Sequence, residues 1–138
     1  MIIQEIENKI IEKLNSIDEL VEVFDYYNTV FDGFPYAGVE LIEMKGNKLD
    51  TSRNVRNWQF WVLVFQETSI MWREQAKNLL YEIANKIITE FDSDWTLWGL
   101  AVNSAVTEVT INDWVNDKKW KGLYLAVTLS IDTLLNIL

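Results

Sequence analysis

The chain has 138 residues, of which 49% are hydrophobic and 24% are charged, and it carries a net charge of −9. This balance is typical of one globular domain with its own hydrophobic core and is unlike that of a disordered segment. The chain has no Cys and no His, which excludes disulfides, thiolate nucleophiles, histidine bases and the usual zinc and haem ligands. We therefore expect a single domain over residues 1–138 that is not an enzyme and has no catalytic residues, metal or cofactor.

The acidic balance argues against tight binding to nucleic acid. The 12 basic residues are outnumbered by 21 acidic ones, and phosphate binding requires clustered basic side chains that displace counterions. The acidity has two interpretations: it keeps the protein soluble, or it forms a surface past which DNA moves without adhering. The first residues lack the basic start of a signal peptide, and no apolar run approaches the length of a membrane span, so we expect neither feature.

Apolar residues at helical spacing predict two helices. The first covers residues 2–15, and its apolar stripe consists of Ile3, Ile6, Ile10 and Leu14. The second and longer helix covers residues 72–91, and Thr68 and Ser69 before it are its expected N-cap. Its apolar stripe consists of Trp72, Ala76, Leu79, Leu80, Ile83, Ala84, Ile87, Ile88 and Phe91.

Two strands are predicted directly after the first helix. Residues 20–27 form the first strand, and their alternation leaves open which of its faces is buried. Asp32-Gly33 indicates a turn. Pro35 precedes a second strand over residues 36–43, at a position where a proline interrupts no ladder hydrogen bond. Residues 44–53 are polar, so we expect them to form the loop of a hairpin that leads to the next strand.

The third strand, residues 56–67, has two halves of different character. Trp58 lies between polar neighbours, which indicates one buried face, whereas residues 60–65 are apolar without a break, which indicates burial on both faces. The second covering surface is either the core of the domain or another subunit. Trp61 lies in the apolar half and is therefore a candidate for contact between subunits.

Two more strands are predicted after the second helix. Residues 100–111 form the fourth strand, residues 112–121 form a polar loop, and residues 123–131 alternate as a strand with one buried face. The last residues, 134–138, form an apolar tail that requires a packing partner. The order of the elements predicts an α+β fold, with a single mostly antiparallel (mixed) sheet of four to five strands and two helices packed on one face.

The acidic residues give only weak signs of a site. Asp92 and Asp94 imitate the start of a calcium loop, but Leu97 stands where such a loop needs Gly, so a helix-to-strand turn is the favoured interpretation. A catalytic pair of carboxylates needs a cleft and a perturbed pKa, and neither is visible in a sequence. Scattered carboxylates that are able to pair in the folded chain include Glu40, Glu43 and Glu108.

Aromatic residues in predicted loops favour an interaction surface. Seven Trp is a high content for 138 residues, and Trp suits an interface that is apolar and also donates a hydrogen bond. The tryptophans in predicted loops are Trp95, Trp98, Trp114 and Trp120. One such residue is usually a lid on the core, whereas several in two connections favour contact with a partner over plain packing.

The features of the chain, taken in order, resemble one known family. They are an N-terminal helix, the stretch Phe31-Asp32-Gly33-Phe34-Pro35 before a strand, a polar hairpin, an aromatic strand that ends in Gln66-Glu67, a long helix and two closing strands. The combination covers nearly the whole chain. It resembles the tail terminator (tail completion) proteins of long-tailed, siphovirus-like bacteriophages and their relatives among phage neck proteins.

The resemblance implies a structural virion protein of α+β fold. Such proteins form a ring, usually a hexamer, at the head-proximal end of the tail tube, where they end tube polymerisation and join the tail to the neck. The implied partners are further copies of the chain, the major tail tube protein and a neck or head completion protein. DNA passes through the ring without tight binding, and no membrane is involved. The implied location is the tail–neck junction of the virion, and the host cytoplasm during assembly.

Under this resemblance, the candidate contacts with the tube or with a neighbouring subunit are basic hairpin residues and tryptophans. They are Lys45, Lys48, Arg53, Arg56, Trp61, Trp114 and Trp120. The alternative for the hairpin is an ordinary solvated loop. The alternatives for the whole protein are a head-side neck or head completion protein of similar fold, an interaction module without a viral role, and a small α+β domain that binds a ligand or acts as an enzyme.

Overall fold

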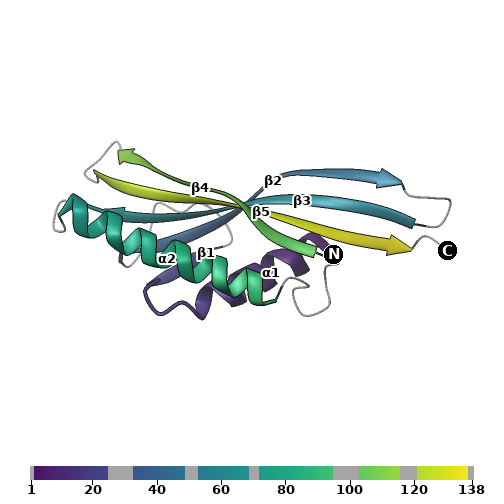
Figure 1. The fold of residues 1–138 in the computed structure, drawn as a ribbon, viewed down its shortest axis with the longest axis horizontal. Coiled ribbons are helices and arrows are strands. Elements are labelled where there is room, and N and C mark those ends of the chain that lie inside the picture. Colours follow the sequence, from purple (N-terminus) through teal and green to yellow (C-terminus); the bar gives the residue numbers. More distant parts are fainter. Residues whose placement is uncertain are drawn as a thin grey trace.

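The computed structural model describes residues 2–24, 33–48, 53–68, 72–94, 103–115 and 121–136. The elements in chain order are α1 (Ile2–Asn15), β1 (Glu22–Phe24), β2 (Tyr36–Lys48), β3 (Arg53–Glu67), α2 (Arg73–Ser93), β4 (Asn103–Val115) and β5 (Lys121–Asn136). The described strands form one sheet in the order β1-β2-β3-β5-β4, in which β1 and β2 are parallel and the other pairs are antiparallel. Both helices lie against the same face of this sheet (Figure 1). The α+β fold expected from the sequence is therefore confirmed.

The two central strands form a continuous ladder along the length of the molecule. β3 and β5 pair without interruption from Arg53↔Asn136 to Glu67↔Gly122. Figure 1 shows that the sheet is strongly twisted and that the helices cover only part of its length. The end of β2, the start of β3 and the end of β5 project beyond the helices, and this part is called the projecting end below.

Each of the two strands beside the central ladder contains a β-bulge. In β2 the register shifts between Leu41 and Glu43, and in β4 it shifts between Val106 and Glu108. A bulge adds one unpaired residue to a strand and increases its local twist. The two bulges therefore contribute to the strong twist of the sheet.

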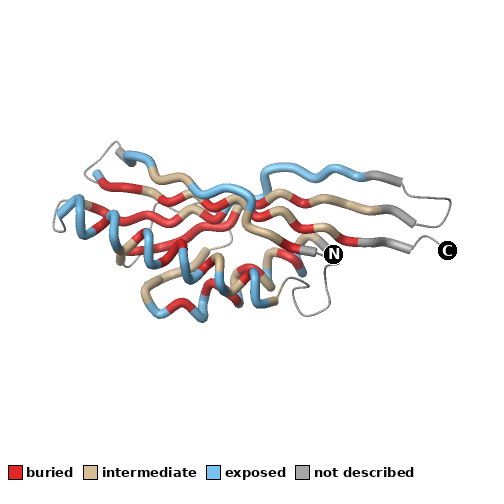
Figure 2. Tube along the Cα trace, viewed as in Figure 1, coloured by how far each residue is buried: buried red, intermediate tan, exposed pale blue. Residues whose placement is uncertain are grey.

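The hydrophobic core lies between the helices and one face of the sheet. Figure 2 shows that the buried residues concentrate in the part of the sheet that the helices cover. Alternation in the strands and helical spacing in α1 and α2 direct the apolar side chains to this layer. Its members from the central strands are Trp58, Phe60, Val62, Val64, Leu123, Leu125, Val127, Leu129 and Ile131. Its main members from the helices are Ile6, Ile10, Leu14, Ala76, Leu80, Ile83, Ala84, Ile87 and Phe91.

The first helix has the bounds that the sequence predicts, but the start of the second helix differs. α2 begins at Arg73, and Trp72 is its N-cap residue without a side-chain capping hydrogen bond. Trp72 is 81% exposed, so its place in the apolar stripe was wrong. Thr68 was also wrong as a cap, because its backbone N–H donates to the carbonyl oxygen of Lys121 at 2.9 Å and extends the strand pairing. Ser69 lies outside the described residues.

Two predicted loops are shorter than expected, because the strands beside them are longer. Lys45 and Lys48 belong to β2, and Arg53 belongs to β3, so the hairpin loop predicted over residues 44–53 was mostly wrong. Polar residues fill these strand ends because the projecting end has no helix against it, and both of its faces are available to water. Trp114 likewise lies in β4, where it pairs with Gly122.

Several other predicted segments change their bounds. The first strand begins at Glu22 rather than at residue 20, and residues 25–27 of its predicted range lie outside the described residues. Its described part, Glu22–Phe24, pairs with the start of β2. The apolar tail predicted from residue 134 continues β5 as far as Asn136. Trp95, Trp98 and Trp120 lie outside the described residues, as do residues 31–32 of the stretch before β2 and residues 137–138.

A buried lysine joins the two helices. The side chain of Lys13 is only 5% exposed, and its Nζ lies 3.3 Å from the carbonyl oxygen of Glu90 and 3.2 Å from the carboxylate of Asp94. The same Nζ lies 5.8 Å from the centre of the Phe91 ring. A buried charge is tolerated only with such partners, so these contacts hold the end of α1 against the end of α2. Asp94, from the candidate calcium loop, therefore pairs with a lysine, and residues 95–97 of that loop are outside the described chain.

A second ion pair connects α2 to the segment after α1. Nζ of Lys86 lies 2.6 Å from Oε1 of Glu19. The hydrogen bond to Glu19 raises the pKa of Lys86 above its ordinary value of 10.5. A raised lysine pKa means that the folded state binds this proton more tightly than the unfolded state does. The stabilisation is therefore complete below the ordinary pKa and is lost as the pH rises through the raised pKa.

We expect Thr133→Val to lower the free energy of unfolding by about 1–3 kcal/mol, because it leaves a buried donor without a partner. The indole N–H of Trp58 donates to Oγ1 of Thr133 at 3.0 Å, and both side chains are buried. Urea unfolding followed by tryptophan fluorescence measures the loss. The matched control is Thr128→Val on the opposite face of β5, which we expect to change stability by about 0.5 kcal/mol or less. Equal losses in the two variants would contradict a role for this hydrogen bond.

Candidate functional site

The face of the sheet that points away from α1 and α2 is called the open face below. Strand alternation places Trp61 and Leu63 of β3 and Ala126 and Thr128 of β5 on it. Neither helix covers this face (Figure 1). The sequence predicted burial of residues 60–65 on both faces, and this is only partly correct. Phe65 is buried on the open face, whereas Trp61 on the same face is 42% exposed.

The register of the strands arranges the open face in rows that run across β2, β3, β5 and β4. The first row consists of Tyr36, Phe65, Tyr124 and Asn112. The second row consists of Gly38, Leu63, Ala126 and Thr110. The third row consists of Glu40, Trp61, Thr128 and Glu108. The fourth row consists of Glu43, Gln59, Ser130 and Ala105.

The first row forms a wall of packed aromatic rings. The rings of Tyr36 and Phe65 stack with their centres 4.9 Å apart, and the rings of Phe65 and Tyr124 lie 5.9 Å apart. Phe24 and Phe34 pack against Tyr36 from the side of β1, at 6.2 Å and 5.7 Å between ring centres. This end of the open face is therefore covered by the chain itself and is rigid.

Toward the projecting end, the open face is polar and its side chains bond to one another. Nε2 of Gln59 donates to Oδ1 of Asn57 at 2.7 Å and to Oγ of Ser130 at 3.1 Å. Nδ2 of Asn57 donates to Oγ of Ser130 and to Oδ1 of Asp132, both at 2.8 Å. These amides and hydroxyls are already satisfied, so this part of the face is ordered before any partner binds.

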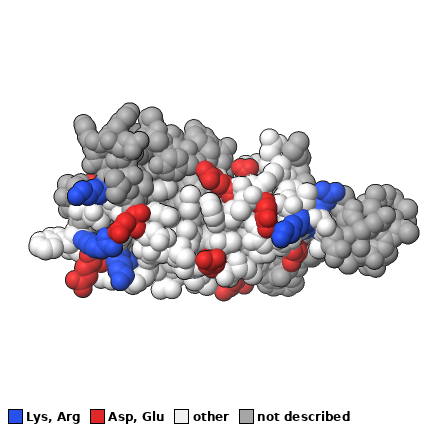
Figure 3. Space-filling model, turned by 90° about the horizontal axis from the view of Figure 1, so that it is seen from above, with Lys and Arg blue, Asp and Glu red and all other residues white. Residues whose placement is uncertain are grey.

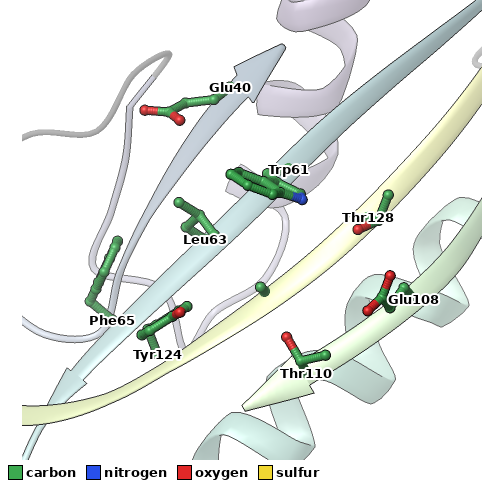
Figure 4. A pocket seen from close by; sticks show the side chains of 9 residues that line it. Glu40, Trp61, Leu63, Phe65, Glu108, Thr110, Tyr124 and Thr128 are labelled. Carbon is green, nitrogen blue, oxygen red and sulfur yellow. The ribbon is translucent and has the colours of Figure 1, made fainter. Parts of the chain in front are cut away.

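Between the aromatic wall and the third row, the open face contains a hollow of about 440 Å³. It arises because the second row carries small side chains at Gly38 and Ala126. Figure 4 shows the indole of Trp61 in its middle, with Glu40 of β2 on one side and Glu108 of β4 on the other. Three strand spacings of about 4.8 Å each separate these two carboxylate positions, which gives roughly 14 Å between their backbones. A hollow of this volume falls within the range of about 300–1,000 Å³ that is usual for binding pockets.

The hollow is acidic. Of the residues that the structure describes, no Lys or Arg lines it. Glu40 and Glu108 form no ion pair with any residue of the described ranges. Figure 3, which looks onto the middle of the open face, shows a largely uncharged centre with scattered acidic side chains, and Lys and Arg only toward the two ends. This surface is therefore suited to an apolar or cationic partner and not to an anion.

The structure places the sequence-predicted contact residues in three separate regions. The backbones of Lys45, Lys48, Arg53 and Arg56 lie at the projecting end, where Gly46 pairs with Arg56 and Lys48 pairs with Asn54. The register places the side chain of Lys45 on the open face and that of Arg56 on the helix side. Trp61 lies apart from them in the hollow. The backbone of Trp114 pairs with Gly122 at the far end of the central ladder. Trp120 lies outside the described residues, so its role stays a prediction.

Two features of the surface were missed in the sequence. Glu40 and Glu108 were recognised only as carboxylates that are able to pair, because the row that joins them depends on strand register and on two bulges. The other missed feature is an apolar edge. Among the described residues, β1 pairs with β2 as far as Gly38, and Leu41, Ile42 and Met44 beyond that point are exposed. Alternation gives no signal for such an edge, since the same pattern fits a strand inside a sheet.

Comparisons of the sequence with protein-family models and with curated proteins gave no match. Within the described ranges, no group of three or more acidic residues is arranged to hold a metal ion. Neither of the described helices is long and apolar enough to cross a membrane. The features that bear on function are therefore the shape and chemistry of the open face, the exposed apolar residues of β2 and the projecting end.

Proposed function

We propose that the protein is a structural component of a bacteriophage tail, of the tail terminator type. In this role it assembles into a ring at the head-proximal end of the tail tube, ends tube polymerisation and joins the tail to the neck. Its partners are further copies of itself, the tube protein and a neck protein. Its location is the tail–neck junction of the virion, after assembly in the host cytoplasm.

The observation that carries this proposal is the long sheet that is covered on one face only. Its open face presents Trp61, which is 42% exposed, beside a hollow. Exposed aromatic surface next to apolar side chains is characteristic of protein contact sites. Beyond Gly38, β2 adds Leu41, Ile42 and Met44 to the exposed apolar surface. No strand of the described ranges pairs with this edge, and natural proteins seldom leave a long strand edge of this kind uncovered, so a partner strand or surface is expected there.

The two sides of the molecule differ, which favours a ring over a two-fold dimer. β2 exposes the apolar Leu41, Ile42 and Met44 on one side of the sheet, whereas β4 on the other side exposes Glu108 and Val109. Contact between two different surfaces joins copies head to tail, and such contacts close into rings when the rotation between copies allows it. The net charge of −9 suits a channel through which DNA moves without adhering.

We expect Trp61→Lys to prevent ring assembly and to leave the fold intact. The side chain lies on the open face, and a lysine in its place would bury an unpaired charge in the contact. The measurement is sedimentation velocity with negative-stain electron microscopy at rising protein concentration. The wild type is expected to form closed rings with a central opening, whereas the variant is expected to sediment as a monomer with the circular dichroism spectrum of the wild type.

The matched control is Tyr81→Lys, because Tyr81 on α2 is 47% exposed and lies on the helix side of the sheet. This variant should assemble as the wild type does. Equal loss of assembly in both variants would show that the contact is not confined to the open face. A wild type that stays monomeric at all concentrations, alone and with a tube protein, would contradict the terminator role and leave an interaction module as the better description.

A further inference from the structure

We propose that the hollow on the open face receives a basic side chain from the projecting end of a second copy of this chain. The proposal rests on the ring assembly proposed above, and it names the two surfaces that meet. One is the row of Glu40, Trp61, Thr128 and Glu108. The other is the basic end of the β2–β3 hairpin.

The hollow has the chemistry of a receptor for a cation. The exposed indole of Trp61 offers a ring face, and Lys or Arg groups bind most strongly to the ring face of Trp. Glu40 and Glu108 lie on either side of this ring and have no ion-pair partner among the described residues. A guanidinium or ammonium group placed over the indole would be within reach of a carboxylate on each side.

The projecting end has the complementary chemistry. Lys45, Lys48, Arg53 and Arg56 are four of the 12 basic residues in the chain, and the pairing of β2 with β3 gathers them at one end. The side chain of Lys45 is 75% exposed, and its Nζ lies 3.6 Å from Oε1 of the exposed Glu43. An exposed ion pair of this kind contributes little to stability. Lys45 therefore loses little free energy when it leaves Glu43 and pairs with another carboxylate.

The two surfaces cannot meet within one chain. Arg56 and Trp61 lie on the same straight strand, β3, and a rise of about 3.4 Å per residue separates them by roughly 17 Å. The ladder with β5 prevents β3 from folding back onto itself. A contact between the basic end and the hollow therefore joins two copies, and it uses different patches on each copy, as a head-to-tail assembly requires.

The first test reverses the charges on each surface. Glu40→Lys with Glu108→Lys reverses the hollow, and Lys45→Glu with Arg56→Glu reverses the projecting end. For each double variant, sedimentation velocity is expected to give a dissociation constant at least about tenfold higher than that of the wild type, because like charges now face each other. The variant with all four changes is expected to recover association. Circular dichroism and thermal unfolding check that the variants are folded.

The second test uses the absence of Cys from the chain. Gly46→Cys labels the projecting end, where an added Cβ meets nothing within 4 Å, and Thr110→Cys labels the hollow. After mild air oxidation of an equal mixture, a mixed disulfide dimer is expected to exceed the homodimer of either variant on a non-reducing gel. The control is a mixture of Gly46→Cys with Asn78→Cys, which lies on the exposed side of α2.

The outcomes separate this inference from the proposed function. Rings that form normally in the charge-reversed variants, without an excess of mixed dimer, would overturn the inference and leave the ring proposal in place. A mixed dimer in a wild-type background that forms no rings would support the contact and contradict the closed ring. Absence of both rings and mixed dimer would overturn both.

Discussion

Phe60→Ala is expected to lower the free energy of unfolding by about 3–5 kcal/mol. Phe60 is completely buried and is one of the largest buried side chains of the protein. It points from β3 toward the helices, so its removal leaves a cavity that the surrounding core is too closely packed to fill. Domains of this size have a total stability of only about 5–15 kcal/mol, so the variant is expected to be near its unfolding threshold. Urea unfolding followed by circular dichroism measures the change.

The adjacent residue is the control for this prediction. Trp61 is larger than Phe60 but lies on the open face, where water replaces the lost side chain. We expect Trp61→Ala to cost about 1 kcal/mol, because most of the area lost borders solvent rather than the core. A larger loss from Trp61→Ala than from Phe60→Ala would mean that the open face holds part of the core.

Gly122→Ala is expected to destabilise the protein by about 3 kcal/mol or more. An added Cβ at Gly122 would lie only 2.8 Å from Cα of Glu67 and 2.9 Å from the carbonyl carbon of Gln66, and still closer to the carbonyl oxygen of Gln66. These are backbone atoms of the neighbouring strand, which do not rotate away as a side chain would. The substitution therefore has to separate β3 from β5 at the start of the ladder. Thermal unfolding followed by circular dichroism measures the loss.

Gly46→Ala is the matched control, because Gly46 is also a strand glycine but has no atom within 4 Å of an added Cβ. We expect this variant to be as stable as the wild type or slightly more stable, since alanine restricts the unfolded chain. Similar losses at both positions would indicate that chain flexibility, and not the close approach at Gly122, explains the effect.

The helices and the buried face of the sheet were predictable, because they follow from periodicity alone. The stripe of Ile6, Ile10 and Leu14 placed α1 correctly, and the alternation of residues 123–131 gave the buried face of β5. The strand ends were not predictable in the same way. Residues 45–48 contain no apolar side chain, because no helix lies against them, and a polar segment without alternation has the sequence pattern of a loop.

The candidate surface was predictable only in part. Trp61 was expected to face a second surface, and it is exposed on the open face. The gathering of Lys45 and Arg56 also follows from the hairpin that the sequence predicts. The position of Glu40 and Glu108 in the same row as Trp61 was beyond prediction, because strand order β3-β5-β4 and the location of both bulges decide it, and no local pattern encodes either.

The two bulges determine which insertions and deletions the chain tolerates. Each bulge adds one residue to its strand, so the residues on the open face change between even and odd numbers at that point. In β2, for example, Glu40 lies on the open face before the bulge and Glu43 lies on it after the bulge. Deleting Ile42 would therefore remove the bulge and leave Lys45 on the open face, because Glu43 would follow Leu41 directly and still pair with Gln59. In sequences descended from the same ancestor, single-residue deletions are therefore expected at residues 42 and 107, whereas a single deletion elsewhere in these strands would exchange the two faces of the sheet.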